Sequence, residues 1–396
     1  MTPSAHAHPE AVIDPTAAST PSSPITNRWG EVEPERPPVE HFIVHRGDPE
    51  ASYNHHAQLT SHAGRLIATW SNGYRDEDQC GQRMLMAVSD DRGETWSRPQ
   101  PVVDRPPGRG VVTSMGVHVH AGGLTAYAGY YEITDHGLLG YYATGGNHGM
   151  SKRGKPYHAL NHTRILTSGD GGHTWQDAGR IDRFVPNLAP HRLTGGRLIL
   201  PGNLAFYHTD DPAGVTGWTY AGLPRLPEGY SDDPEGFWRG CAARGDETHY
   251  CEGSCFETDD ATLHMMLRAG GRCLAVTESH DRGETWSEPM ATAFTDCHCR
   301  HHFGRLPDGR YIATSCPAPG SIRTPMVLAI SDDGVAFDRH VMLGDDPFRF
   351  PRIMGMHKYG RYGYPSFHVT DEALFVIYSI SREDIGVARL ELSDLD

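Results

Sequence analysis

Apolar and polar residues alternate along short segments of this chain, and these segments come in pairs separated by turn residues. Typical pairs are "GRLIATWSNG" with "QRMLMAVSDD" and "GRYIATSC" with "TPMVLAISDD". A period of two residues predicts β-strands, whereas an amphipathic helix would repeat every 3.6 residues. We count six strand-rich units, which begin near residues 64, 116, 191, 261, 309 and 364. A further segment, "HFIVHR" at 41–46, is a spare strand able to close a ring.

One turn motif recurs after these strand pairs. Its copies are "SDDRGETW" from Ser89, "SGDGGHTW" from Ser168, "SHDRGETW" from Ser279 and the worn "SDDGVAFD" from Ser331. The Ser and Asp side chains can accept hydrogen bonds from backbone amides of a tight turn, Gly permits a positive φ, and Trp fills space between sheets. This motif resembles the Asp-box hairpin of sialidase-like β-propellers. It predicts an all-β fold with a single propeller, and it carries little information on chemistry.

Composition narrows the functional classes. The chain has 396 residues, 45 of them Gly and 29 Pro, and a formal net charge of −15. The negative charge argues against nucleic acid as a partner, and no apolar run is long enough to span a bilayer, so no membrane partner is expected. Residues 1–40 are rich in Pro, Ser, Thr and Ala and predict a disordered or draped tail before a propeller domain at 41–396. Because no secretory leader is evident, a cytoplasmic location is expected.

The starts of the inner strands are where chemistry is expected, because a propeller gathers them around one end of its central channel. "YNHHA" occupies this place in the first unit, "CEGSCFE" and "DCHCRHH" in later units, and "YGYPSFH" in the last. Neighbouring residues of a strand point to opposite faces. We therefore expect one of His55 and His56 to face the channel while the other braces the blade.

A resemblance extends over most of the chain. The run "YNHHAQL…GRLIATWSNGYRDEDQCGQRMLMAVSDDRGETW" and the ending "YGYPSFHVTDEALFVIYSISREDIGVARLEL" are similar to propeller-type polysaccharide lyases that cut ulvan. They are more similar to relatives acting on L-rhamnosyl-α-1,4-D-glucuronate, described as lyases or as α-L-rhamnosidases. The resemblance implies seven blades, one more than our count. The missing unit would lie within Asp211–Tyr250.

The resemblance also implies site residues. The catalytic set would be His55 or His56, Tyr131 (or Tyr130) and Arg164. The substrate-binding set would be Gln82, Arg83, Arg323 and Tyr364. Several have a structural alternative: Tyr131 as a packed aromatic residue, Arg164 in an ion pair between blades, and Gln82 with Arg83 holding the first blade together through Asp76 or Asp78.

The implied reaction is β-elimination at a uronate-containing oligosaccharide. A neutral imidazole would remove the proton next to the carboxylate, an arginine would neutralise that carboxylate, and a tyrosine or the same histidine would protonate the leaving oxygen. Hydrolysis of the same bond is the alternative, although Glu132, Glu252 and Glu257 show no obvious pairing. A sialidase is disfavoured, since no Arg-Ile-Pro motif precedes Ser89. A non-catalytic glycan-binding propeller is the third alternative.

Cysteine spacing suggests a metal site. Cys297, Cys299 and His301 share one face of a strand by alternation, and Cys251 with Cys255 could meet them from the neighbouring blade. Four such ligands, with Cys251, Cys255, Cys297 and Cys299 as the main candidates, would suit a structural zinc ion. Free buried thiols or a disulfide are the alternatives. Catalysis itself requires no metal in this interpretation.

Overall fold

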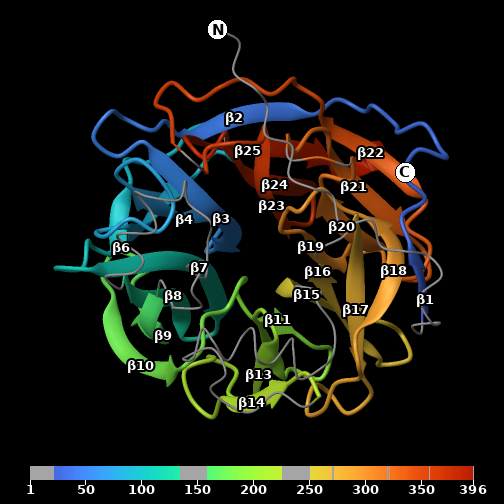
Figure 1. Ribbon diagram of the computed structural model, residues 1–396, viewed down its shortest axis with the longest axis horizontal. Helices are drawn as coiled ribbons and strands as arrows, with labels where there is room; N and C mark the ends of the chain where they lie inside the picture. The colour runs from blue at the N-terminus through green and yellow to red at the C-terminus, as the bar shows by residue number, and fades with distance from the viewer. Residues whose placement is uncertain are drawn as a thin grey trace, which may run out of the picture.

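A computed structural model of the chain describes residues 22–133, 158–224, 250–269, 272–318, 320, 322–355 and 357–395. These residues form six β-sheets arranged as blades in a ring, with one inner strand of each blade toward the centre (Figure 1). No helix among them is long and apolar enough to cross a bilayer. The all-β propeller predicted from the alternating segments is confirmed.

Each blade is built from strands that follow one another along the chain, and the first of them lies at the channel. Blade 1 contains β3 (Tyr53–His62), β4 (Arg65–Gly73), β5 (Arg83–Ser89) and β6 (Gln100–Val103). Blade 2 contains β7 (Gly110–His120), β8 (Gly123–Ile133), β9 (His158–Ser168) and β10 (Gln176–Asp182). Blade 3 contains β11 (His191–Arg192), β12 (Leu198–Pro201), β13 (Ala205–Thr209) and β14 (Thr219–Gly222).

The second half repeats the pattern. Blade 4 contains β15 (Cys251–Glu257), β16 (Leu263–Arg268), β17 (Cys273–Ser279), β18 (Met290–Thr295) and, at its outer edge, β1 (Ser22–Thr26). Blade 5 contains β19 (His302–Arg305), β20 (Tyr311–Ser315), β21 (Met326–Ser331) and β22 (Arg339–Gly344). Blade 6 contains β23 (Tyr362–Val369), β24 (Ala373–Ile380), β25 (Asp384–Glu391) and β2 (Glu40–His45). A 3₁₀ turn, Leu392–Leu395, follows β25.

The expectation of seven blades is wrong for the described residues, which form six sheets. The count from strand periodicity was correct, and the count implied by resemblance was not. Within the range Asp211–Tyr250, the described part supplies β14, the outer strand of blade 3, and residues 225–249 lie outside the described residues.

Two N-terminal segments fasten the ring. The spare strand β2 pairs antiparallel with β25, so a segment from the N-terminal part of the chain completes the C-terminal blade 6 and closes the ring as predicted (Figure 1). Arg389 of β25 adds an ion pair at 2.6 Å to Glu40 of β2 and one at 3.2 Å to Glu94 of blade 1. The described part of the predicted tail begins with β1, which pairs in parallel with β18 of blade 4. An ion pair of 2.7 Å between Glu35 and Arg339 holds the following segment against blade 5.

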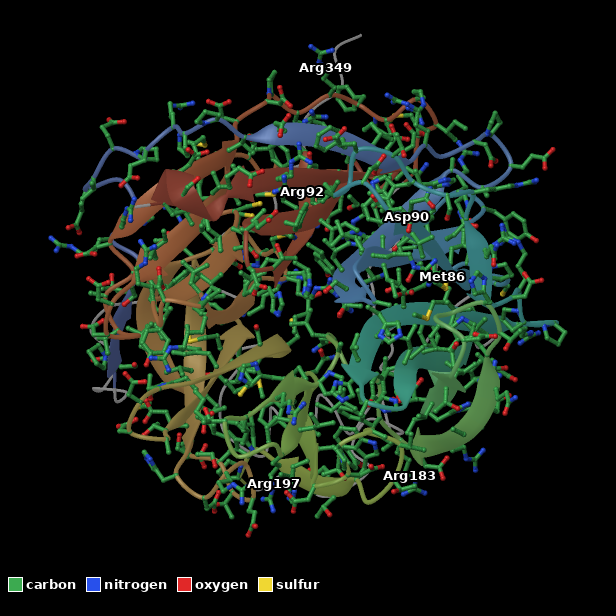
Figure 2. All side chains as sticks on the ribbon, turned by 180° about the vertical axis from the view of Figure 1, so that it is seen from behind. Met86, Asp90, Arg92, Arg183, Arg197 and Arg349 are labelled. Atoms are coloured by element: carbon green, nitrogen blue, oxygen red, sulfur yellow. The ribbon has the colours of Figure 1, made fainter. Side chains whose placement is uncertain are left out.

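The Asp boxes lie between the third and fourth strands of four blades. In the first box the Ser89 hydroxyl donates to Asp91 at 2.8 Å and accepts from the Gly93 amide at 2.8 Å. The same two bonds recur at Ser168, Ser279 and Ser331. Bonds from the Thr95 hydroxyl and amide lower the pKa of Asp91 to about 2. Neighbouring blades are also joined near the rim, where Arg197 (Figure 2) links Asp210 to Glu284.

Candidate functional site

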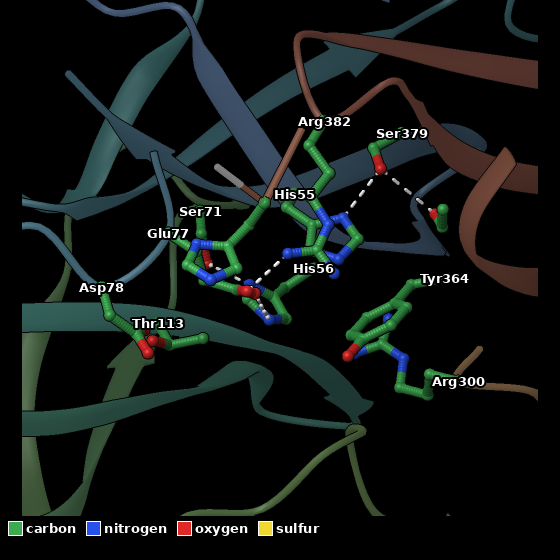
Figure 3. Close-up of polar contacts among 12 residues, drawn as sticks. His55, His56, Ser71, Glu77, Asp78, Thr113, Arg300, Tyr364, Ser379 and Arg382 are labelled. Carbon is green, nitrogen blue, oxygen red and sulfur yellow. Dashed lines mark hydrogen bonds and ion pairs between the residues drawn. The ribbon is translucent and has the colours of Figure 1, made fainter. Parts of the chain in front are cut away.

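The topology of the blades gathers one set of strand ends and loops at a single mouth of the channel. In each antiparallel blade, the start of the inner strand lies beside the end of the second strand. The starts of β3, β15 and β23 therefore meet the connections that follow β4, β16, β20 and β24. The close-up in Figure 3 shows the resulting cluster around His56, Glu77, Tyr364 and Arg382.

Three inner strands carry an irregularity at the same level. Register shifts interrupt β3 after His55, β15 after Cys251 and β23 after Gly363. The residue that follows has a positive φ in each case: His56 at 54°, Glu252 at 52° and Tyr364 at 55°. Non-glycine residues rarely adopt this conformation, which costs roughly 1–3 kcal/mol and concentrates at functional sites. Each bulge changes the direction of one polar side chain.

The bulge in β3 corrects the expectation that His55 and His56 lie on opposite faces. Alternation fails at a left-handed residue, and the two imidazole rings lie only 4.6 Å apart between centroids. His55 is fully buried, and its Nδ1 contacts the Ser379 hydroxyl at 2.7 Å. The side chain of His56 is 12% exposed, with its Nδ1 3.2 Å from the Ser71 hydroxyl and its Nε2 3.5 Å from Glu77.

Burial keeps both imidazoles neutral at physiological pH. Desolvation lowers the pKa of His56 to about 4, against an opposing effect of Glu77. Desolvation, aided by the charge of Arg382, holds the pKa of His55 well below its usual range. A neutral imidazole can accept a proton or donate a hydrogen bond, but it cannot neutralise an anionic substrate.

The lowered pKa values of the buried histidines predict that the free energy of unfolding decreases in acid. Five histidines on or beside the inner strands have folded pKa values below the ordinary 6.5: about 4 at His56, His191, His301 and His368, and about 3 at His302. Because each folded pKa lies below the unfolded value, the unfolded chain takes up these protons first. We expect the free energy of unfolding to decrease as pH falls from about 6.5 to about 4, by several kcal/mol in sum. Urea titrations across this range measure it, and a midpoint that stays constant between pH 7 and 5 would contradict the prediction.

A tyrosine–carboxylate pair lies next to the histidines. The Tyr364 hydroxyl of β23 donates a short hydrogen bond to Glu252 of β15, and the Tyr364 ring lies 4.2 Å from that of His55. Arg268 donates to the other oxygen of Glu252 at 2.7 Å. Burial alone would raise the pKa of Glu252, but Arg268 and the Tyr364 bond lower it, so Glu252 is ionised. Burial and then Glu252 raise the pKa of Tyr364 well above its usual range, so Tyr364 keeps its proton.

Three buried guanidinium groups surround the Tyr364 ring. The Cζ atoms of Arg300, Arg323 and Arg382 lie 4.9, 5.2 and 5.9 Å from its centroid. Arg382 forms a short ion pair with Glu77. Arg300 donates to the carbonyls of Asn187 and Ala57, and Arg323 to the carbonyl of His298. Neither Arg300 nor Arg323 has a carboxylate partner among the described residues.

The wall facing Tyr364 comes from blades 1 and 2. Tyr131 of β8 donates a short hydrogen bond to Asp78 and lies 3.4 Å from the Thr113 hydroxyl. Asp78, which follows β4, is partly exposed and has a positive φ of 58°. His56 lies between Asp78 and Tyr364 in Figure 3. The structure thus brings together four predicted residues, His55, His56, Tyr131 and Tyr364, and places the predicted Arg323 beside the Tyr364 ring.

Two other predicted residues, Arg164 and Arg83, lie outside this cluster, and a third, Gln82, lies at its edge, where it accepts the Asp78 amide at 3.3 Å. Arg164 of β9 makes a two-pronged ion pair with Asp177 of β10 at 2.8 Å, which lies within blade 2 and not between two blades as its alternative role would require. Gln82 is buried and donates to the Val112 carbonyl and the Thr113 hydroxyl, joining blade 1 to blade 2. Arg83 donates to Asn72 at 2.9 Å and lies near Asp104. These contacts are structural.

The cysteines form a cluster that differs from the predicted one. The sulfur atoms of Cys297, Cys299 and Cys316 lie within 4.8 Å of one another, and all three residues are fully buried. Burial by itself would raise the pKa of Cys299, but bonds from the other two thiols and the charge of Arg323 lower it well below its usual range. Cys251 and Cys255, on β15, belong to no such cluster among the described residues. The Cys299 sulfur accepts the Tyr364 amide at 3.2 Å.

Sequence reasoning missed several members of the site. Arg300 lies inside "DCHCRHH", a stretch selected for its place at a strand start. Arg268 is the last residue of the second strand β16, Arg382 lies in the turn after the second strand β24, and Cys316 follows β20. Their positions in the sequence could have indicated them, because the end of each second strand lies beside the start of the inner strand in an antiparallel blade. Glu252 was considered, but its pairing with Tyr364, 112 residues later, is not visible in the sequence.

Comparison with known proteins agrees with this architecture. A model of the BNR repeat-like domain matches residues 64–377. The chain belongs to this family. Among curated proteins, anhydrosialidase of Macrobdella decora is 26% identical over 147 residues, which cover 32% of this chain and 16% of that protein.

Solved structures extend the likeness of this BNR-family chain to the whole fold. A protein of unknown function from Dyadobacter fermentans aligns with a TM-score of 0.61 and 16% identity, covering 90% of this chain and 99% of that one. Trypanosoma rangeli sialidase aligns at 0.63 with 14% identity, covering 91% and 59%. Hadza microbial sialidase Hz136 aligns at 0.62 with 14% identity, covering 89% and 68%. These identities show a shared fold, and the relationship to polysaccharide lyases stays a prediction.

Proposed function

We propose that this propeller is a glycoside hydrolase for a sugar that carries a carboxylate, with Tyr364 as nucleophile and Glu252 as its base. One observation carries the proposal: two buried guanidinium groups, Arg300 and Arg323, have no carboxylate partner among the described residues and lie beside the Tyr364–Glu252 pair. The Cys299 thiolate partly balances Arg323, whereas Arg300 has no ion-pair partner among the described residues, and a buried charge without a paired counter-ion is unfavourable. A carboxylate on the substrate supplies that counter-ion and fixes the orientation of the sugar.

The reaction follows from the protonation states. Ionised Glu252 takes the phenol proton as the Tyr364 oxygen attacks the anomeric carbon, and the glycosidic bond breaks. The surrounding arginines stabilise the negative charge that develops on the phenol oxygen. Water then attacks the anomeric carbon and gives its proton to the carboxylate that protonated the leaving oxygen, the tyrosyl–sugar bond breaks, and Glu252 returns the proton to the Tyr364 oxygen. Tyrosine nucleophiles are an established exception to the use of two carboxylates in glycosidases.

We assign the proton donor for the leaving oxygen to Asp78. Glu77 is occupied by its ion pair with Arg382 and by the Tyr53 hydroxyl at 3.1 Å, and Asp76 accepts the His357 amide at 3.1 Å. Asp78 is partly exposed and faces Tyr364 across His56. Tyr131 holds its carboxyl group in place.

The decisive experiment uses methylumbelliferyl glycosides of N-acetylneuraminic acid, D-glucuronic acid, L-rhamnose and D-glucose. Release of the fluorophore from an acidic sugar, and not from the neutral ones, supports the proposal. A fluorinated analogue of the hydrolysed sugar is then expected to leave a covalent adduct on the peptide that contains Tyr364, as found by mass spectrometry. Turnover of neutral sugars alone would overturn the role of the arginines.

Elimination from rhamnosyl-α-1,4-glucuronate is the second candidate. It is favoured by the neutral His56 imidazole 5.4 Å from the Tyr364 ring, an arrangement suited to a base and an acid on one substrate. Here Arg300 or Arg323, rather than Arg164, would neutralise the uronate. Incubation with rhamnosyl-glucuronate oligosaccharides separates the candidates. Elimination would give a new ultraviolet absorbance and a uronate product whose mass is one water less than that of the hydrolysed uronate. Rhamnose release without the absorbance would indicate hydrolysis. Binding without either product would indicate a glycan-binding propeller.

We also propose that Cys297, Cys299 and Cys316 hold a structural zinc ion. Three buried sulfur atoms that converge, one of them favouring the thiolate, supply three of the four ligands of a structural zinc site. Such an ion would fix the connection before β19 to the end of β20. It would also hold the backbone of Tyr364, whose amide bonds the Cys299 sulfur. It supplies no catalytic group.

Metal analysis tests this assignment. Protein purified without chelator is expected to contain about one zinc ion per chain, and Cys316→Ala is expected to lose it and unfold at a lower temperature. Cys80→Ala is the matched control, because Cys80 is partly exposed in the connection after β4 and belongs to no such cluster. Full zinc content in Cys316→Ala would show that the ion lies elsewhere.

A further inference from the structure

A cavity lies between the inner strands, beyond the cluster around Tyr364. Its volume is about 320 Å³, and its walls come from β3, β7, β11, β15, β19 and β23. On β3 it begins at Gln58, two residues after His56, and on β23 at Ser366, two residues after Tyr364. The cavity thus continues along the same inner strands.

Arg300 separates this cavity from the Tyr364 cluster. One face of its guanidinium lies over the Tyr364 ring, and its Nη2 donates to the carbonyl of Ala57, which stands between His56 and Gln58. Its Nη1 donates to Asn187, next to Leu188 of the cavity wall. A molecule in this cavity therefore does not contact the Tyr364 hydroxyl, and the two sites are distinct.

The cavity wall offers fixed donors and acceptors of hydrogen bonds. His302 Nδ1 accepts the Phe367 amide at 3.1 Å, which places its proton on Nε2. His118 Nε2 donates to the Pro212 carbonyl at 2.9 Å, which leaves its Nδ1 as an acceptor. Hydroxyl and amide groups add to these at Thr60, Ser254 and Gln58.

The wall is almost uncharged, and part of it is aromatic. Burial lowers the pKa of His191 and His368 to about 4 and that of His302 to about 3, so all three are neutral near pH 7. The His302 ring stacks on Phe367 with centroids 4.2 Å apart. Arg192 is the only formally charged side chain among those lining the cavity in the described part of the chain, and it is exposed.

We propose that this cavity is a second carbohydrate site, which binds one neutral sugar ring. A pyranose presents hydroxyl groups that both donate and accept, and an apolar face that packs on an aromatic ring. The volume lies at the lower end of the range for small-molecule sites, about 300–1,000 Å³, and suits a single ring. The absence of paired charges in the wall disfavours an acidic sugar, in contrast to the Tyr364 cluster.

Ligand-observed NMR with free L-rhamnose, D-glucose and D-galactose tests the proposal on the full chain. At least one is expected to bind, and His191→Ala is expected to weaken its affinity about tenfold through loss of a hydrogen-bonding wall residue. His302→Phe, which keeps the stacked ring and removes both nitrogens, provides a second variant. His173→Ala, an exposed histidine in the second Asp box, is the matched control.

Two further measurements distinguish binding at this site from binding at the proposed active site. Tyr364→Phe is expected to bind the neutral sugar with unchanged affinity, whatever becomes of its hydrolytic activity. D-glucuronate and sulfate are expected not to compete with the sugar. The proposal is overturned if none of the three sugars binds, if binding is unaffected by both cavity variants, or if the charged probes occupy the cavity in their place.

Discussion

Tyr364→Phe is expected to lower kcat by on the order of 10³–10⁶-fold on any acidic glycoside that the protein hydrolyses, because it removes only the attacking oxygen. The ring would keep its contacts with His55 and the three arginines. Steady-state kinetics with the best substrate of the glycoside panel measure the effect. KM should change far less than kcat, since the carboxylate of the substrate is still bound by Arg300 and Arg323.

The same strand provides the control for this variant. Tyr362, two residues before Tyr364, is also buried, but its hydroxyl bonds Asp346 at 3.2 Å, away from the cluster. Tyr362→Phe is expected to retain most of the activity. If Tyr364→Phe is as active as Tyr362→Phe, Tyr364 is not the nucleophile. In that case His56→Ala decides whether the elimination candidate takes its place.

Arg382→Met is expected to produce the largest loss of stability, about 3–5 kcal/mol. It would leave Glu77 as a buried carboxylate without its cation. The side chains of Arg382 and Glu77 are only 3% and 10% exposed, so water compensates little of the lost interaction. Denaturation by urea, followed by tryptophan fluorescence, measures the change in the free energy of unfolding.

Arg164→Met is the matched control, because Arg164 also forms an arginine–carboxylate ion pair, with Asp177, but its side chains are 30% and 65% exposed. Its expected cost is at most about 1 kcal/mol. The double variant Arg382→Met/Glu77→Gln should recover part of the stability, since it removes the unpaired charge. Equal costs for the two single arginine variants would mean that the Arg382–Glu77 pair is not effectively buried.

Local sequence patterns predicted the propeller because the responsible interactions are local. The Asp-box bonds join residues two to four positions apart, as from Ser89 to Asp91 and Gly93. The alternation of apolar and polar residues in "GRLIATWSNG" and "QRMLMAVSDD" likewise indicates two neighbouring strands of one blade. The prediction of a seventh blade was wrong for the described residues. It came from the family resemblance, whereas strand periodicity supported only six units.

The candidate site was predicted only in part, because its chemistry depends on pairs distant in the sequence. His55, His56 and Tyr364 were found from their place at strand starts. Their arrangement could not be predicted. The bulge at His56 brings both imidazoles together, and the Glu252–Tyr364 hydrogen bond joins two blades. Arg164 was misassigned for the same reason: nothing local distinguishes an arginine that faces Asp177 from one that faces a substrate.

The sequence by itself determined the blades, the closing strand β2 and the mouth at which polar side chains would collect, because periodicity and turn chemistry act over a few residues. Only the tertiary structure decided which of those side chains form a site. Ring closure sets the distance between blades, and the left-handed residues of β3, β15 and β23 set the direction of each side chain. Together they place Tyr364 between Glu252 and three buried arginines.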